Sequence, residues 1–294
     1  MVDIAQWFIE TRGTIEDWIR EDLPLHKSDQ PMVEDVMRYS LLAGGKRLRP
    51  QLVLATADYV GLSYNKVRAA ALAVEYLHTY SLIHDDLPAM DNDDLRRGMP
   101  TAHKVYGDAM AILAGDALLT ESWVKMMNLV TEGFDVQDVL AASRALAVAA
   151  GRSGLVRGQV LDLSAENRVL SREQLEAIHR LKTGALFEAC CSIPAILIGD
   201  SKAQAELAEF ARHFGLAFQI VDDILNVIGD RAVMGKATGT DVALGKSTYP
   251  GLLGIDEAQR LAKGYQKRAE QVLDDRKTTD VLLAILRFAV DRQW

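Results

Sequence analysis

The chain has 294 residues, of which 49% are apolar and 25% are charged, and this is the composition of an ordinary globular protein. Its net charge of −8 argues against nonspecific binding of nucleic acid, which needs a basic surface to displace counterions. An anionic substrate would therefore have to find a local cationic pocket.

The N-terminus has none of the features of a targeting segment. Residues 1–4 do not form a basic region followed by an apolar stretch, and no apolar run reaches the about 18 residues of a membrane span. Cys190 and Cys191 are adjacent, so they supply no disulfide framework and fit a reducing compartment. We therefore expect a cytoplasmic protein without a membrane span.

Apolar residues recur at steps of three and four along most of the chain, which is the spacing of one face of an α-helix. Glycine and proline are confined to short junctions, and no linker separates one part of the chain from another. No segment alternates convincingly as a strand does. We expect an all-α fold in which residues 1–294 form a single domain, a large helical bundle.

The first motif in chain order is Gly-Gly-Lys-Arg-Leu-Arg-Pro at residues 44–50. Its three basic residues stand just before a helix whose first turn would contain Pro50, and helix N-termini bind phosphate groups well. A basic surface loop would have the same sequence. The motif alone therefore leaves both interpretations open.

The next helix carries polar residues on its apolar face. His78, Ser81 and Asp85 follow Val74 and Leu77 at helical spacing. Because an unpaired charge in a hydrophobic core is very costly, these positions indicate a polar cavity inside the bundle.

Five aspartates occur within the ten residues that begin at Asp85. Pro88 should end the helix within one turn, so that the chain curls and Asp91 returns to Asp85. Clustered carboxylates favour Mg²⁺, which binds through one or two carboxylates together with substrate phosphate and water. Arg96 and Arg97 follow, and they either balance this acidic charge or donate hydrogen bonds to a phosphate.

Two later helices also place polar groups on apolar faces. Lys182 interrupts one apolar stripe and Asp222 follows another. An ion pair between Lys182 and either Asp85 or Asp222 is the simplest alternative interpretation. Asp222 and Asn226 lie one helical turn apart and can present two oxygens to one ion, with Gln219 near enough to assist. Two metal-binding motifs on different helices, at Asp85 and at Asp222, imply that a polyanion binds between them.

Residues 235–247 carry Lys236 and Lys246 and imitate a nucleotide P-loop. One residue too many separates Gly239 from Gly245 for that motif, and no β–α–β pattern surrounds it. We interpret this segment as a flexible lid that carries two lysines.

Together these motifs resemble those of the trans-isoprenyl diphosphate synthases, most closely the bacterial farnesyl diphosphate synthase (geranyltranstransferase) type. The resemblance covers nearly the whole chain and implies the all-α isoprenoid synthase fold, with a central cavity. It rests on residues 44–50, the first acidic run with its Arg-Arg-Gly, Gly158-Gln159 with Asp162, Lys182-Thr183-Gly184, Phe218-Gln219 with Asp222-Asp223, and Gly245-Lys246-Ser-Thr-Tyr-Pro.

The resemblance implies two diphosphate sites and a set of catalytic residues. The site for isopentenyl diphosphate would consist of Lys46, Arg49, His78 and Arg97. The site for the allylic diphosphate would consist of Arg96, Lys182, Thr183, Gln219 and Lys236, with Lys246 closing over it. Asp85, Asp91 and Asp222 would hold three Mg²⁺ ions, and with Arg96, Lys182 and Lys236 they would be the catalytic residues.

The implied reaction is a Mg²⁺-dependent head-to-tail condensation. Mg²⁺ and cationic side chains would stabilise the departing allylic diphosphate, and the isopentenyl double bond would attack the resulting allylic carbocation. Proton loss, with the released diphosphate as the base, would complete a trans double bond. The resemblance also implies a homodimer, although the sequence does not identify its interface.

Three positions bear on the length of the product and on the binding of the metal. Tyr80 and Ser81 lie about one helical turn before Asp85 and would bound the pocket for the growing chain. The aromatic Tyr80 implies farnesyl diphosphate (C15), while the small Ser81 leaves geranylgeranyl diphosphate (C20) as the alternative. Asn226 replaces the last aspartate of the family's second motif, so we expect weaker binding of that ion without loss of activity.

Three other functions remain open from the sequence. His84-Asp85 is the dipeptide of a metal-dependent phosphohydrolase, although that chemistry needs further inward histidines. A class I terpene cyclase also combines helices with aspartate-rich motifs, but it needs no isopentenyl site. A noncatalytic partner subunit would be expected to have lost aspartates from these motifs. Asn226 is the one position where an aspartate of the family's motifs is replaced.

Overall fold

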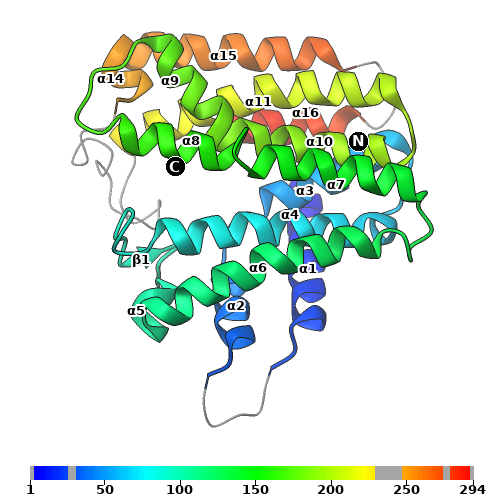
Figure 1. Cartoon of the computed structure of the whole chain (residues 1–294). Coiled ribbons are helices and arrows are strands. Elements are labelled where there is room, and N and C mark those ends of the chain that lie inside the picture. The colour runs from blue at the N-terminus through cyan, green and yellow to red at the C-terminus, as the bar shows by residue number, and fades with distance from the viewer. Residues whose placement is uncertain (1–2, 26–30, 229–246, 274–278, 292–294) are drawn as a thin grey trace.

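The structure is a computed structural model that describes residues 3–25, 31–228, 247–273 and 279–291. It is built from helices, which confirms the predicted all-α fold (Figure 1). The first helices are α1 (Ile4–Asp22), α2 (Val33–Leu42), α3 (Leu48–Val60), α4 (Tyr64–Asp85), α5 (Ala102–Tyr106), α6 (Asp108–Asn128) and α7 (Val136–Ala150). They are followed by α8 (Leu155–Ser164), α9 (Arg172–His179), the π-helical turn η1 (Arg180–Gly184), α10 (Ala185–Leu197), α11 (Ser201–Ile228), α14 (Tyr249–Leu253), α15 (Ile255–Val272) and α16 (Thr279–Val290).

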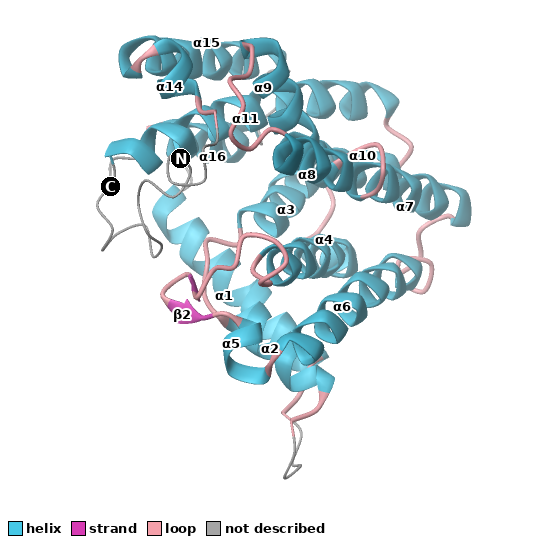
Figure 2. Ribbon diagram, turned by 60° about the vertical axis from the view of Figure 1, so that its left-hand side comes forward, coloured by secondary structure: helices cyan, strands magenta, loops and turns pink. Residues whose placement is uncertain are grey.

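The strands in the described part of the chain are β1 (Leu95–Arg96) and β2 (Met99–Pro100), which form a short antiparallel hairpin. Strands of two residues leave no alternating pattern in a sequence, so the hairpin was not predicted. It follows the first acidic run and lies beyond the C-terminal end of α4, beside α5 (Figure 2).

α4 lies in the middle of the molecule (Figure 2). Its buried residues occupy every side of the helix. A helix without a polar face has to be covered all round, and α3 and α6 pack against α4. Beyond α3, α10 packs against α7 and α11, and α15 covers α11. The buried side chains of these helices form one hydrophobic core.

One stretch, Val136–Ser164, is long and apolar enough by composition to cross a membrane. It consists of two helices, α7 and α8, which are separated by a turn at residues 151–154. The 15 residues of α7 extend about 22 Å, less than the about 30 Å of a bilayer core. Only 33% of the most apolar window is buried, so these helices present apolar surface to the outside of the bundle.

Candidate active site

The first acidic motif stands where α4 ends. The helix ends at Asp85, Pro88 follows in a series of turns, and the backbone N–H of Asp91 donates to the carbonyl of Asp85 at 2.9 Å. The predicted return of Asp91 to Asp85 is therefore confirmed. Burial raises the pKa of Asp85 to about 6, Lys182 opposes this shift, and Asp91 adds to it. A bound cation would stabilise the ionised form of Asp85 against this burial.

Arg96, on β1, binds the second aspartate of this motif. Its Nε donates to both carboxylate oxygens of Asp86, at 2.7 and 2.9 Å, and its Nη2 donates to Asp93 at 3.3 Å. Burial alone would lower the pKa of Arg96, but the hydrogen bond to Asp86 and the charges of Asp86, Asp93 and Asp85 together outweigh burial, and the pKa is raised. A diphosphate that used Arg96 would therefore compete with Asp86 for this guanidinium.

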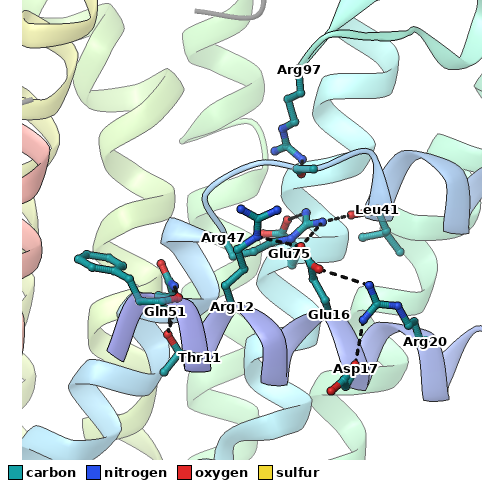
Figure 3. Close-up of polar contacts among 12 residues, drawn as sticks. Thr11, Arg12, Glu16, Asp17, Arg20, Leu41, Arg47, Gln51, Glu75 and Arg97 are labelled. Atoms are coloured by element: carbon teal, nitrogen blue, oxygen red, sulfur yellow. Dashed lines mark hydrogen bonds and ion pairs between the residues drawn. The ribbon is translucent and has the colours of Figure 1, made fainter. Parts of the chain in front are cut away.

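Arg97 reaches back to the basic motif instead (Figure 3). Its Nη1 donates to the carbonyl oxygen of Gly44 at 2.5 Å. A Cβ at Gly45 would lie 2.5 Å from Cζ of Arg97, and Gly45 has a φ of +108°, so glycine is needed there on both grounds. Burial lowers the pKa of Arg97 to about 10, which still leaves it cationic near neutral pH.

Arg49 and His78 form a partly buried basic group with Arg97. The Nη1 of Arg49 lies 3.0 Å from the Nε2 of His78, and its guanidinium packs over the Phe187 ring, 4.7 Å from the centroid. Burial, followed by the charges of Arg49 and Arg97, lowers the pKa of His78 well below its usual value. The ring is therefore neutral and its Nε2 can accept from Arg49. Lys46, the fourth residue assigned to this site, is exposed, with Nζ 5.8 Å from the Phe288 ring.

Arg47, the middle basic residue of the motif, is held inside the protein (Figure 3). Its Nη1 donates to the buried carboxylate of Glu75 at 2.7 Å, and its Nη2 donates to the carbonyl of Leu41. Glu16 of α1 lies 3.7 Å from the same guanidinium. Arg47 thus anchors the loop before α3 to α1 and α4. Sequence reasoning missed Glu75, whose only signal was an acid on the apolar face three residues before His78.

Lys182 lies in η1, and its Nζ donates to the carboxylate of Asp162 on α8 at 2.7 Å. The two elements come close because Gly158 has no side chain, since a Cβ there would lie 2.2 Å from the backbone nitrogen of Lys182. The sequence alone leaves open an ion pair of Lys182 with Asp85 or Asp222, and the structure shows a different partner. The observed partner, Asp162, was not among the predicted site residues.

The second acidic motif lies on α11. Asp222 and Asn226 are partly buried, and the charge of Asp222 acts on Arg49 of the basic group. Gln219, one turn earlier, accepts a hydrogen bond from the Thr183 hydroxyl at 3.0 Å, which joins α11 to η1. The C-terminal ends of α4 and α11 lie at the same end of the bundle, so the two acidic motifs share that end (Figure 1).

The two residues assigned to product length are buried on α4. The Tyr80 ring meets the His84 ring edge-on with 5.7 Å between centroids, and burial followed by the charge of Asp85 raises the pKa of Tyr80. The Ser81 hydroxyl donates to the carbonyl of His78 at 2.8 Å. Tyr80 is therefore the bulky group one turn below the first acidic motif.

The predicted lid, with Lys236 and Lys246, lies outside the described residues. Within the described ranges, no three carboxylate, imidazole or thiol groups are gathered closely enough to hold a metal by themselves. Mg²⁺ commonly takes only one or two carboxylates and completes its shell with phosphate and water. The oxygen donors of Asp85, Asp91 and Asp222, and the raised pKa of Asp85, fit that kind of ion.

The chain matches the family model described as polyprenyl synthetase over residues 30–282. It is 46% identical over 279 residues to farnesyl diphosphate synthase of Escherichia coli (strain K12), which covers 92% of each chain. It is also 47% identical over 256 residues to a chloroplastic geranylgeranyl pyrophosphate synthase of Capsicum annuum, covering 85% of this chain and 69% of that one.

Solved structures are similar over nearly the full length. An FPP/GFPP synthase from Zymomonas mobilis has a TM-score of 0.87 at 34% identity, with 98% of this chain and 99% of that chain covered. A geranyltransferase from Helicobacter pylori, complexed with magnesium and isoprenyl diphosphate, has a TM-score of 0.84 at 32% identity, with 99% and 97% covered. These matches confirm the resemblance seen in the sequence, and the chain belongs to the polyprenyl synthetase family of prenyltransferases.

Proposed function

We propose that the protein condenses isopentenyl diphosphate head to tail (1'-4) with dimethylallyl or geranyl diphosphate, using Mg²⁺, and releases farnesyl diphosphate (C15). The observation that carries this proposal is a partly buried group of basic residues, Arg49, His78 and Arg97, beside acidic motifs on two different helices. The acidic motifs suit a metal-bound diphosphate, and the basic group suits a second diphosphate without metal. Two such sites fit a reaction between two diphosphates.

The roles of the residues follow from their chemistry. Asp85, Asp91 and Asp222 would hold Mg²⁺, which when bound supplies positive charge to the departing allylic diphosphate. Arg96 and Lys182 are held in place by Asp86 and Asp162, and the leaving group would compete with these two carboxylates for their positive charge. The basic group would hold the isopentenyl diphosphate in line with the allylic carbon.

The C15 product is the finer part of the proposal. Tyr80, buried one turn before Asp85, would close the pocket below the allylic carbon and stop growth of the chain. Geranylgeranyl diphosphate (C20) is the second candidate, because Ser81 is small and a geranylgeranyl pyrophosphate synthase is as similar in sequence as the bacterial farnesyl diphosphate synthase.

Release of inorganic diphosphate with one substrate at a time tests the reaction class. We expect release with Mg²⁺ only when isopentenyl diphosphate and an allylic primer are both present. Release from the primer alone would instead indicate a hydrolase or a cyclase, and no release from any mixture would indicate a noncatalytic subunit.

We also propose that the protein is a homodimer that buries the apolar face of α6 and α7. Several large apolar side chains on these helices are more than two fifths exposed: Ile112, Leu113, Met127, Val136, Leu140 and Val148. Light scattering of Leu140→Lys should give the monomer mass, while Val169→Lys, at an exposed loop position, should leave the dimer intact. A dimer in both variants would place the interface elsewhere.

A further inference from the structure

Asp223 is the second aspartate of the second acidic motif, and it is turned into the protein. Its side chain is 5% exposed, whereas its neighbour Asp222 is only partly buried. One carboxylate oxygen of Asp223 accepts the backbone N–H of Tyr249 at 3.0 Å, and the other accepts the Nε2 of Gln219 at 3.3 Å. Both oxygens are therefore engaged by groups of the protein itself.

The ring of His179 borders the same carboxylate. The Nε2 of His179 lies 3.6 Å from the oxygen of Asp223 that accepts from Tyr249, and the His179 and Tyr249 rings stack with 5.5 Å between centroids. Asp223 thus joins α11 to the end of α9 and to the start of α14. A side chain fixed from three elements has little freedom to turn toward a ligand elsewhere.

Two hydrogen bonds connect Thr183 to Asp223 through Gln219, and each is donated toward Asp223. Gln219 turns its NH₂ group toward Asp223, to which its Nε2 donates. The amide oxygen of Gln219 then faces Thr183 and accepts its hydroxyl proton at 3.0 Å. Thr183 has only that one proton, so its oxygen keeps only lone pairs for a further partner.

We propose that Asp223 is a positioning residue and not a metal ligand. It fixes the amide of Gln219 and, through that amide, turns the oxygen lone pairs of Thr183 toward the electron-poor allylic group of the bound primer. This assignment rests on the proposed function, because it needs an allylic group that becomes positive during the reaction. The two adjacent aspartates would then have different roles. Asp222 would bind metal, and Asp223 would orient Gln219 and Thr183.

Asp223→Asn is the informative variant because it keeps the size of the side chain. The asparagine oxygen can still accept the N–H of Tyr249, while its NH₂ group faces Gln219 and forces that amide to turn over. Thr183 would then receive a hydrogen bond instead of donating one. The variant therefore reverses the hydrogen-bond chain and preserves the contact between α11 and α14.

Binding of Mn²⁺ in the presence of inorganic diphosphate, followed by calorimetry, tests the first half of the proposal. We expect Asp223→Asn to bind within about threefold of the wild type, and Asp222→Asn to bind at least about tenfold more weakly. Equal losses in the two variants would make Asp223 a ligand and overturn the proposal. This comparison needs no turnover, so it tests Asp223 even if the wild type forms no prenyl product, a result that would contradict the proposed function alone.

A double-mutant cycle tests the second half. We expect Asp223→Asn and Thr183→Val each to lower kcat about tenfold, with the KM for isopentenyl diphosphate unchanged. Because both changes break the same hydrogen-bond chain, the double variant should be no slower than Thr183→Val alone. Effects that multiply, or equal rises in both KM values, would show that Asp223 does not act through Thr183. If Asp223→Asn unfolds, Gln219→Leu replaces it in the cycle with the same expectation.

Discussion

The carboxylate of Glu75 accepts a hydrogen bond from the guanidinium of Arg47 at 2.7 Å, and their side chains are 1% and 0% exposed. Removing one partner of such a pair leaves the other charge buried without compensation. We expect Glu75→Gln to lower the free energy of unfolding by about 3–5 kcal/mol, as measured by urea denaturation.

Glu16→Gln is the matched control, because Glu16 also approaches Arg47, at 3.7 Å, but lies nearer the surface. We expect this change to cost no more than about 1 kcal/mol. Equal losses in the two variants would mean that Glu75 is not the main partner of Arg47.

Adjacent glycines in the basic motif give a second prediction. Both have a positive φ, +90° at Gly44 and +108° at Gly45, but only at Gly45 would a Cβ meet Arg97. Backbone strain is thus similar for Gly44→Ala and Gly45→Ala. We expect only Gly45→Ala to raise the KM for isopentenyl diphosphate, by about tenfold, because it displaces Arg97 from its place beside Gly44. Equal KM values in the two variants would remove Arg97 from the isopentenyl site.

The pKa of Asp85, raised to about 6 by burial, predicts how metal binding depends on pH. Below pH 6 the protonated carboxyl cannot act as a ligand, so affinity for Mn²⁺ with inorganic diphosphate should fall as the pH drops through 6. Titrations from pH 5 to 8 would measure this. An affinity that stays constant over that range in the wild type would contradict the role of Asp85.

The raised pKa of Asp85 also determines how the stability of the metal-free protein depends on pH. A carboxyl whose pKa rises on folding, from 3.8 to about 6, binds protons more tightly in the folded state. Its contribution to stability is therefore greatest below pH 3.8 and is lost as the pH rises to 6. We expect Asp85→Asn to raise the melting temperature of the metal-free protein at pH 7.5 and to abolish the stabilisation by Mg²⁺ with diphosphate. An unchanged melting temperature would contradict the burial cost assigned to Asp85. Unchanged stabilisation by Mg²⁺ with diphosphate would contradict its role as a metal ligand.

Tyr80 gives a prediction about product length. Replacing this buried ring by alanine opens space one turn below the first acidic motif, so Tyr80→Ala should shift the product from C15 toward C20. Tyr106→Ala, which removes a half-buried ring on α5, should leave the product unchanged. A product of Tyr80→Ala that remains C15 would show that another residue closes the pocket.

Asn226 gives a prediction about the second acidic motif. An amide oxygen binds Mg²⁺ less strongly than a carboxylate, so Asn226→Asp should lower the Mg²⁺ concentration needed for half-maximal activity. The turnover rate at saturating Mg²⁺ should change little. An unchanged Mg²⁺ requirement would mean that residue 226 does not contribute to that site.

Local rules were enough to predict much of the fold and part of the site. The 3.6-residue period predicts the helices, Pro88 predicts the end of α4 near Asp85, and the return of Asp91 follows from that ending. The meeting of Arg49 and His78 was expected from the family resemblance, and the structure places them 3.0 Å apart.

The partners of the charged residues could not be predicted in the same way. Arg47 and Arg49 are two residues apart in one motif, yet Arg47 binds Glu75 inside the protein while Arg49 reaches His78. Which of them turns inward depends on how α3 packs on α4, and no periodicity encodes that. Lys182 likewise finds Asp162 only because Gly158 lets α8 approach η1, a contact that becomes visible once the helices are packed.

The most direct test of the account is to incubate the purified protein with Mg²⁺, isopentenyl diphosphate and either dimethylallyl or geranyl diphosphate, and to identify the dephosphorylated products by gas chromatography and mass spectrometry. We predict farnesol from both primers. Geranylgeraniol as the main product would keep the reaction but contradict the C15 limit at Tyr80, and the absence of any condensation product would contradict the proposed function.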